Sequence, residues 1–247
     1  MRVELLNSKE ELQAAEDRAA QAMLTCRNNV GRLSKEPTRN FIQRAIDMQH
    51  DTILEHISLT YAVYEISRAC LQELARHRHI TLSVESTRSC LWSQMDNDFI
   101  EQKFNPGSTK HEAALKFLEF ARAHPTMSND KLKYYLPEFW PTNLIMTLNV
   151  RELRHIVRLR SAPVALEEFR NLATALCDAL PDSFSYWWTD CLRTKLKPCI
   201  ICKFNALTTI DHSLYCQNCG STLIFPGHFS TSQIIDNYNK NWEKITQ

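Results

Sequence analysis

Glycine is scarce in this chain, and its scarcity limits how the chain can bind a nucleotide. The 247 residues include 4 glycines, at positions 31, 107, 220 and 227, and these do not cluster. A Rossmann fingerprint and a P-loop both need closely spaced glycines, which let the backbone approach a phosphate. The sequence therefore excludes both, and any nucleotide must be held by side chains.

Positive side chains are concentrated in residues 76–88, directly after an apolar segment. This stretch reads Arg-His-Arg-His-Ile-Thr-Leu-Ser-Val-Glu-Ser-Thr-Arg, so five permanent or switchable cations lie within 13 positions. A guanidinium fork matches phosphate oxygens, and charged residues are seldom drawn toward a core unless an anion meets them. The stretch therefore predicts a phosphorylated ligand. Attraction of basic residues to a helix C-terminus accounts for one or two of the arginines, but not for Ser86 and Arg88.

Apolar periodicity predicts a mixed chain with a helical majority. Alternating β-branched and aromatic residues indicate strands at 57–66 and 142–150. Apolar residues at helical spacing, with a capping box at 8–11, predict helices at about 12–22, 39–49, 67–78, 110–123, 151–160 and 161–180. The Arg-His-Arg triplet then falls on the last turn of the third helix, ahead of a Ser/Thr-rich loop. The last helix includes Val164 and Leu166 among its apolar residues.

Four of the nine cysteines form two C-x-x-C knuckles, which are Cys199 with Cys202 and Cys216 with Cys219, separated by 13 residues. Two such knuckles complete a tetrahedral four-thiolate site for Zn²⁺, and a closed site of this kind is structural. Gly220, just after the second knuckle, suits a turn with positive φ. Two disulfides are the alternative, which a reducing compartment disfavours.

The composition changes near Lys195, where helical periodicity ends. We therefore expect a main domain at residues 1–194 and a zinc-ribbon-like module with the C-terminal tail at 195–247. The other five cysteines lie among apolar neighbours and are expected to be buried reduced thiols. They are Cys26, Cys70, Cys90, Cys177 and Cys191.

The net charge of +1 gives no global argument for binding nucleic acid or membrane. No apolar run approaches the length of a signal peptide or the roughly 20 residues that cross a bilayer, so we expect a cytoplasmic protein. One alternative is a zinc-ribbon nucleic-acid-binding protein whose arginines contact phosphates. Lys195, Lys197 and Lys203 lie near the knuckles, but a solvated face is the simpler interpretation of these lysines.

Four segments, in this order, resemble those of flavin-dependent thymidylate synthases. Residues 50–56 resemble the family's H-x-T-x-x-E-H segment, and 76–86 carry its Arg-His-Arg, seven residues and serine. Residues 133–137 are similar to its basic-x-x-Leu-Pro segment, and 149–160 to its N-x-R-x-L-x-(N/H)-x-x-x-x-R helix. Taken alone, His50, Glu55 and His56 could equally form a hydrogen-bonded cluster at a helix end.

The resemblance implies an α+β fold, a helix-rich domain around a central antiparallel sheet. It implies FAD as cofactor, deoxyuridine monophosphate (dUMP) as substrate, methylenetetrahydrofolate as carbon donor and NADPH as reductant. It also implies a homotetramer with active sites shared between subunits. No protein nucleophile is needed, because the flavin delivers a hydride; Ser86 lacks a nucleophile elbow, and Cys199 belongs to a knuckle.

The same resemblance assigns roles to matching positions. FAD contacts are expected from Thr52, Arg76, His77, Arg78, Asn149, Arg151 and His155. The nucleotide is expected to be surrounded by Glu73, Arg76, Ser86, Thr87, Arg88, Lys133 and Arg160. Arg160 is the catalytic residue, which holds the uracil and favours ionisation of its ring nitrogen.

Several positions depart from the family pattern. His79 replaces a common isoleucine, Val84 a frequent glutamate and Ser89 a frequent tyrosine, while Lys133 gives a point charge in place of a bidentate arginine. Two further arginines of the last segment, Arg154 and Arg158, are expected on a solvated helix face.

Overall fold

The computed structural model describes most of the main domain and the centre of the cysteine-bearing module. The described residues are 1–26, 28, 37–90, 92–162, 164–192, 199–203, 207–210, 213–216, 218–224, 237–238 and 241–242. None of the helices in these ranges is long and apolar enough to cross a membrane.

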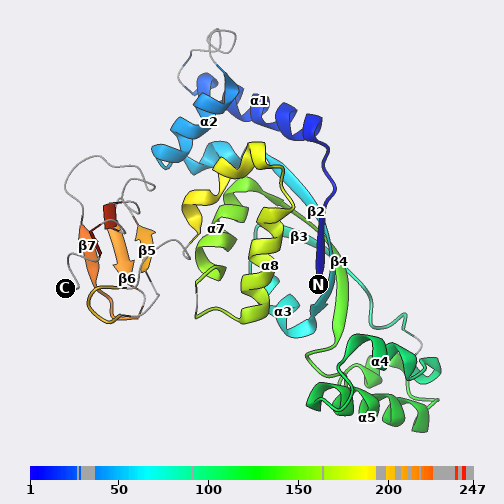
Figure 1. The fold of residues 1–247 in the computed structure, drawn as a ribbon. Helices are drawn as coiled ribbons and strands as arrows, with labels where there is room; N and C mark the ends of the chain where they lie inside the picture. The colour runs from blue at the N-terminus through cyan, green and yellow to red at the C-terminus, as the bar shows by residue number, and fades with distance from the viewer. Residues whose placement is uncertain are drawn as a thin grey trace.

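A four-stranded antiparallel sheet in the order β1-β2-β4-β3 forms the centre of the main domain (Figure 1). Its strands are β1 (Arg2–Leu5), β2 (Ser58–Ser67), β3 (Ile80–Val84) and β4 (Pro141–Asn149). The register is fixed by pairs such as Ser58 with Asn149 and Ile80 with Leu148. The predicted strands at 57–66 and 142–150 are confirmed as β2 and β4, and the α+β class with an antiparallel sheet is confirmed as well.

Two strands were not predicted. Residues 80–84, expected within a Ser/Thr-rich loop, form β3, because Ile80 and Leu82 pack against the core while Thr81 and Ser83 are exposed. This is the period-two pattern of a strand with one face covered. The other strand, β1, has four residues at the sheet edge and is too short to give a clear pattern.

Helices α7 and α8 lie across one face of the sheet, and α1 and α2 pack at its upper end (Figure 1). The helices of this part are α1 (Lys9–Thr25), α2 (Thr38–Asp47), α3 (Arg68–Leu74), α7 (Val150–Arg160) and α8 (Glu167–Asp178). Three 3₁₀ turns accompany them: η2 (Asp51–His56), η4 (Asp182–Trp187) and η5 (Thr189–Cys191). The capping box is confirmed, since Ser8 and Glu11 exchange hydrogen bonds with each other's backbone N–H groups.

The boundaries of two predicted helices were wrong. Helix α3 is capped by Ser67 as expected, but it ends at Leu74, so residues 76–78 lie in the turn between α3 and β3. Helix α8 begins at Glu167, after an extended Leu166. Val164 and Leu166 are consequently 58% and 44% exposed and do not belong to its apolar face.

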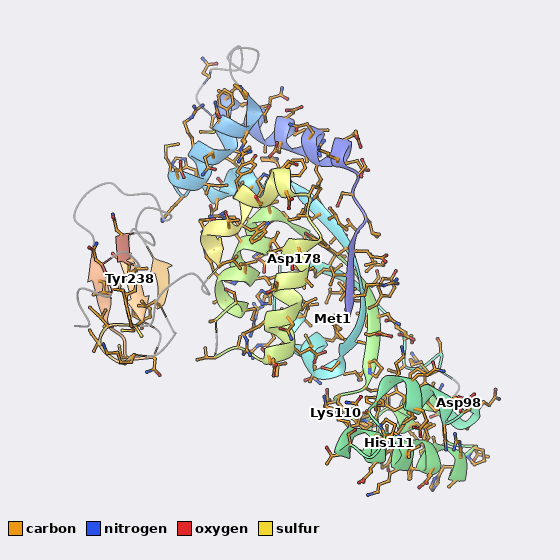
Figure 2. The ribbon with its side chains drawn as sticks, in the orientation of Figure 1. Met1, Asp98, Lys110, His111, Asp178 and Tyr238 are labelled. Atoms are coloured by element: carbon orange, nitrogen blue, oxygen red, sulfur yellow. The ribbon has the colours of Figure 1, made fainter. Side chains whose placement is uncertain are left out.

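A helical lobe extends from the lower end of the sheet (Figure 1). It contains η3 (Trp92–Gln94), α4 (Asp98–Lys103), α5 (Thr109–Ala123) and α6 (Asn129–Leu132) around its own apolar cluster, which includes Trp92 and Trp140. Figure 2 labels His111 in this lobe; its Nε2 lies 2.9 Å from Oε1 of Glu101, and the ring is buried. The lobe lies between β3 and β4 in the chain, so both of its ends join the sheet.

The C-terminal module has a second antiparallel sheet of β5 (Leu207–Ile210), β6 (Ser213–Cys216) and β7 (Thr222–Ile224). Lys195 and Lys197 lie outside the described residues. All nine cysteines are free thiols; Cys70, Cys177 and Cys191 are buried as predicted, and Cys90 is half-buried. The prediction was wrong for Cys26, which is exposed because it caps the C-terminus of α1.

Candidate functional site

The junction between β4 and α7 forms the floor of the candidate site. Asn149 ends the strand and caps the helix, since its Oδ1 accepts a hydrogen bond from the backbone N–H of Glu152 at 2.9 Å. The N–H of Val150 donates to the carbonyl of Ile57 at 2.9 Å, which fixes the same junction to the chain that follows η2. The first turn of α7 is therefore held in place from two sides.

His77 is the centre of a hydrogen-bonded network that joins three helices. Its Nδ1 lies 3.0 Å from Oε1 of Glu152, and Nε of Arg160 donates to its Nε2 at 3.3 Å. Arg160 also donates to Oε2 of Glu73 at 2.9 Å, and its guanidinium lies 4.6 Å from the centre of the Phe169 ring. Residues from α3, α7 and α8 together set the orientation of Arg160.

The same contacts set the protonation state of His77. A ring nitrogen that accepts from the guanidinium of Arg160 must carry a lone pair, so the proton of a neutral ring lies on Nδ1 and is donated to Glu152. The pKa of His77 agrees with this assignment. Burial lowers it below the ordinary value of 6.5, and the positive charge of Arg160 acts in the same direction, while the hydrogen bond to Glu152 acts against both. His77 is therefore a neutral imidazole at neutral pH.

Two hollows open beside this network. One, of about 450 Å³, is lined by Glu73, Arg76, His77, Arg78, His79, Glu152, His155, Leu159 and Arg160. The other, of about 470 Å³, is lined by Asp51, Glu55, His79, Asn149, Arg151, Glu152, His155 and Arg158. They share three residues, so they are neighbouring parts of one surface that arginine and histidine dominate.

Several basic side chains at this surface are available to a ligand. The side chains of Arg78, His79 and His155 make no hydrogen bond or ion pair with any other described residue. Arg76 is 75% exposed and has a loose ion pair, 3.7 Å, with Glu73. Such uncommitted donors at a hollow suit an anionic ligand.

The structure brings together most of the residues expected at FAD. Thr52 is exposed on η2, between the two acids that this turn contributes to the second hollow. Arg151 forms an ion pair with Glu55 across the hollow. Within one chain, these positions and the His77 network form one continuous group.

A second group of expected residues lies at the other end of β3. Ser86, Thr87 and Arg88 follow the strand, and NH2 of Arg88 lies 3.0 Å from Oδ2 of Asp130. Nζ of Lys133 lies 3.4 Å from Oδ1 of the same carboxylate. Because β3 contributes about 3.3 Å per residue, its two ends are about 13 Å apart. No hydrogen bond or ion pair joins Arg88 or Lys133 to Arg160 among the described residues, so this group is separate from the His77 network.

The expectation of a solvated face for Arg154 and Arg158 was wrong. The side chain of Arg154 is 1% exposed, and its two terminal nitrogens each lie 2.7 Å from an oxygen of Asp190. Arg158 is 26% exposed and lies 3.4 Å from Oδ2 of Asp51. Both arginines have acidic partners far away in the sequence, which helical spacing does not reveal.

Three site residues were missed by the sequence reasoning. Glu152 orients His77, Asp130 pairs with both Arg88 and Lys133, and Phe169 packs under Arg160. One feature of the sequence could have identified Glu152: it is an acidic residue three positions after the capping Asn149, inside the family segment. Phe169 was expected only as an apolar core residue.

The structure is that of an α+β protein whose antiparallel sheet adjoins a hollow lined mainly by arginine and histidine side chains. Residues 5–184 match the family model described as thymidylate synthase complementing protein, Thy1. This match covers most of the chain. The chain therefore belongs to the flavin-dependent thymidylate synthase family, and it is an enzyme of the methyltransferase type.

Comparison with individual relatives supports the same family assignment. The flavin-dependent thymidylate synthase of Campylobacter jejuni strain RM1221 is 38% identical over 165 residues, which cover 60% of this chain and 78% of that protein. The Wolinella succinogenes enzyme is 38% identical over 167 residues, 61% and 80% of the two chains. The crystal structure of thymidylate synthase X from Helicobacter pylori with FAD and dUMP has a TM-score of 0.67 and 30% identity, covering 78% of this chain and 99% of that one.

Proposed function

We propose that this enzyme converts dUMP to thymidylate, with FAD as cofactor, methylenetetrahydrofolate as carbon donor and NADPH as reductant. The observation that carries the proposal is the rigid group of neutral His77, Arg160 and Glu73 beside a hollow with uncommitted cations. The Helicobacter pylori relative, whose crystal structure contains FAD and dUMP, supports the choice of ligands.

The residues present fit FAD by their chemistry. A dinucleotide brings a diphosphate, and Arg76, Arg78, Arg151 and His155 offer donors for it without any glycine loop. The side-chain amide nitrogen of Asn149 is left for a ligand, because the cap uses only its oxygen. Bound FAD would supply the hydride that completes the methyl group.

Arg160 is the proposed catalytic residue. Hydrogen bonds to Glu73 and His77 and the Phe169 ring below fix its guanidinium before substrate binds. A fixed cation near a uracil carbonyl stabilises negative charge that develops on the ring, and one preorganised donor of this kind contributes about 3–4 kcal/mol. A neutral His77 adds no competing positive charge beside it.

The nucleotide phosphate is assigned to the second group, which comprises Ser86, Thr87, Arg88 and Lys133. The amide of Asn129 donates to the carbonyl oxygens of Arg88 at 2.7 Å and Cys90 at 2.6 Å, so the backbone that carries Arg88 is fixed. The Arg88 side chain is 71% exposed and can leave Asp130 for a phosphate at small cost, since exposed ion pairs contribute about 1 kcal/mol or less.

The active site is proposed to be shared between subunits of a homotetramer. The two groups precede and follow β3 in the chain, and no contact between described residues joins them, so we propose that a second chain supplies one of them to each nucleotide. Tyr134 and Tyr135, next to Lys133, are 83% and 57% exposed. Paired exposed aromatics of this kind mark a surface that another chain covers.

The division into a catalytic domain at 1–194 and a separate module at 195–247 is also proposed. The matched family region ends at residue 184, and the solved relative is covered almost completely by 78% of this chain. The catalytic function is therefore assigned to the first part alone.

The test compares thymidylate formation by three FAD-reconstituted proteins: wild type, Arg160→Ala and Arg18→Ala. Arg18 is an exposed arginine of α1 and serves as the matched control. Arg160→Ala should lower kcat by about 100-fold or more while it retains flavin absorption, because one preorganised donor is lost. Wild-type turnover by Arg160→Ala, or no thymidylate from the wild-type protein, would contradict the proposal.

A further inference from the structure

The four knuckle cysteines converge in the C-terminal module, where the catalytic proposal leaves them without a role. Their sulfurs all lie within 4.8 Å of one another. Sγ of Cys199 is 3.8 Å from that of Cys219, and Sγ of Cys202 is 3.6 Å from that of Cys216. A disulfide would need about 2.05 Å, so these are separate thiols.

These separations match a metal tetrahedron. A zinc–sulfur bond of about 2.3 Å places two sulfurs of a regular tetrahedron about 3.8 Å apart. Both close pairs join one cysteine of the first knuckle to one of the second, so the two knuckles face each other across a common centre. We infer that Cys199, Cys202, Cys216 and Cys219 bind one Zn²⁺ per chain in a closed, structural site.

The two knuckles have the same backbone geometry. The N–H of Lys203 donates to the carbonyl of Cys199 at 2.8 Å, and the N–H of Gly220 donates to that of Cys216 at 2.8 Å. The residue after each knuckle has a left-handed backbone, with φ of 59° at Lys203 and 72° at Gly220. A lysine held in this conformation is strained, so the turn at Lys203 is set by its surroundings.

Both turns also direct N–H groups at sulfur. Backbone groups of Ile201 and Cys202 hydrogen-bond to Sγ of Cys199, and those of Asn218 and Cys219 to Sγ of Cys216. Four thiolates around one Zn²⁺ leave a net charge of about −2, which such donors offset. Four protein ligands leave no open position for a substrate, so the metal is structural.

Ser221 completes the surroundings of the site. Its Oγ lies 3.0 Å from Sγ of Cys219 and 3.6 Å from Sγ of Cys199, so one hydroxyl bridges ligands of both knuckles. Outer contacts of this kind orient ligands. Cys219 is the exposed ligand, which gives the ion a path from solvent, whereas Cys199 and Cys216 are buried.

The proposed metal centre lies within the module's apolar cluster. Among the described residues, five members of this cluster are buried: Cys199, Leu207, Leu214, Cys216 and Tyr238. Figure 2 labels Tyr238 beside the small sheet, and its hydroxyl accepts a hydrogen bond from the N–H of Ile200 at 3.1 Å. Two of the five buried members are themselves proposed ligands, so a bound metal would join the centre of this cluster and stabilise the module.

The test is metal analysis of the full-length protein, purified without chelator from zinc-supplemented cells. Wild type and Cys26→Ser, which changes an exposed cysteine outside the site, should each contain one zinc per chain. Cys202→Ser should contain almost none. Wild-type protein without zinc, with iron in its place, or zinc retained by Cys202→Ser would overturn the proposal.

Two further measurements keep the test valid if Cys202→Ser unfolds the module. Co²⁺ exchanged into the wild-type protein should give the absorption bands of tetrahedral thiolate coordination, and octahedral bands would overturn the proposal. Ser221→Ala keeps all four ligands and should raise the Kd for zinc by about tenfold or more. An unchanged Kd would remove the assigned role of Ser221.

Discussion

The buried ion pair between Arg154 and Asp190 gives the sharpest stability prediction. Arg154 lies on α7, the helix that also carries Arg160, and its side chain is 1% exposed. Its guanidinium donates to the carbonyl of Trp187 at 2.6 Å and to both oxygens of Asp190 at 2.7 Å. Asp51, 3.7 Å from Nε, is the remaining acid.

Asp190→Ala removes two of the three close acceptors and leaves the charge in the core. Removal of one partner of a buried pair costs about 3–5 kcal/mol. Because Asp51 and the carbonyl of Trp187 remain beside the guanidinium, we expect a loss at the low end of this range, about 3 kcal/mol. At about 2–4 °C per kcal/mol for a chain of this size, Tm should fall by about 6–12 °C.

The assay is urea unfolding of wild type, Asp190→Ala and a control, Asp178→Ala, whose exposed acid ends α8 (Figure 2). The control should change the free energy of unfolding by less than about 0.5 kcal/mol. Replacement of both partners, Arg154→Met with Asp190→Leu, should cost less than Asp190→Ala alone, because the buried guanidinium is removed with its partner and Asp51 keeps its ion pair with Arg158. A loss below about 1 kcal/mol for Asp190→Ala would refute the reasoning.

Three other predictions concern titration and the domain boundary. Burial lowers the pKa of His77 below 6.5, so the unfolded chain gains a proton before the folded one as the pH falls, and stability should decline as the pH falls through 6.5. Glu152→Gln keeps an acceptor for Nδ1–H of His77 but removes the negative charge that raises this pKa, and should steepen the decline; an unchanged slope in urea titrations would contradict it. Burial raises the pKa of Glu16 above 4.5, so the stabilising protonated form is lost as the pH rises from 4.5 through the raised pKa, and Glu16→Gln should gain stability relative to wild type over that rise. Truncation after Leu192 should leave flavin binding and thymidylate formation intact, and loss of flavin from the shortened chain would place the boundary elsewhere.

The sequence was sufficient to predict those helices and strands that depend on residues close together in the chain. Phe41, Ile42, Ala45 and Ile46 recur at helical spacing, and all four are buried in α2. The two longest strands and the helix caps followed in the same way, because each depends on neighbours a few residues apart. The proximity of the residues expected at FAD could be predicted, because the family segments place them on elements that meet at one end of the sheet; their contact with FAD stays a prediction.

The sequence was insufficient where a distant partner decides the outcome. Arg154 resembles any surface arginine until Asp190, 36 residues later, is brought beside it. Glu152 meets His77 across 75 residues, and the burial of His77 follows from where α3 ends. Such contacts depend on tertiary packing, which periodicity and spacing do not encode.

The most direct test of a shared active site mixes two inactive variants, Arg160→Ala and Arg88→Ala, in one tetramer by co-expression. Suppose that each site takes Arg160 from one chain and Arg88 from another. With equal mixing, half of the sites receive an intact Arg160, and half of those also receive an intact Arg88. Thymidylate formation should then recover to about a quarter of the wild-type rate. No recovery in tetramers confirmed to contain both variants would show that both arginines act within one chain and would contradict the account.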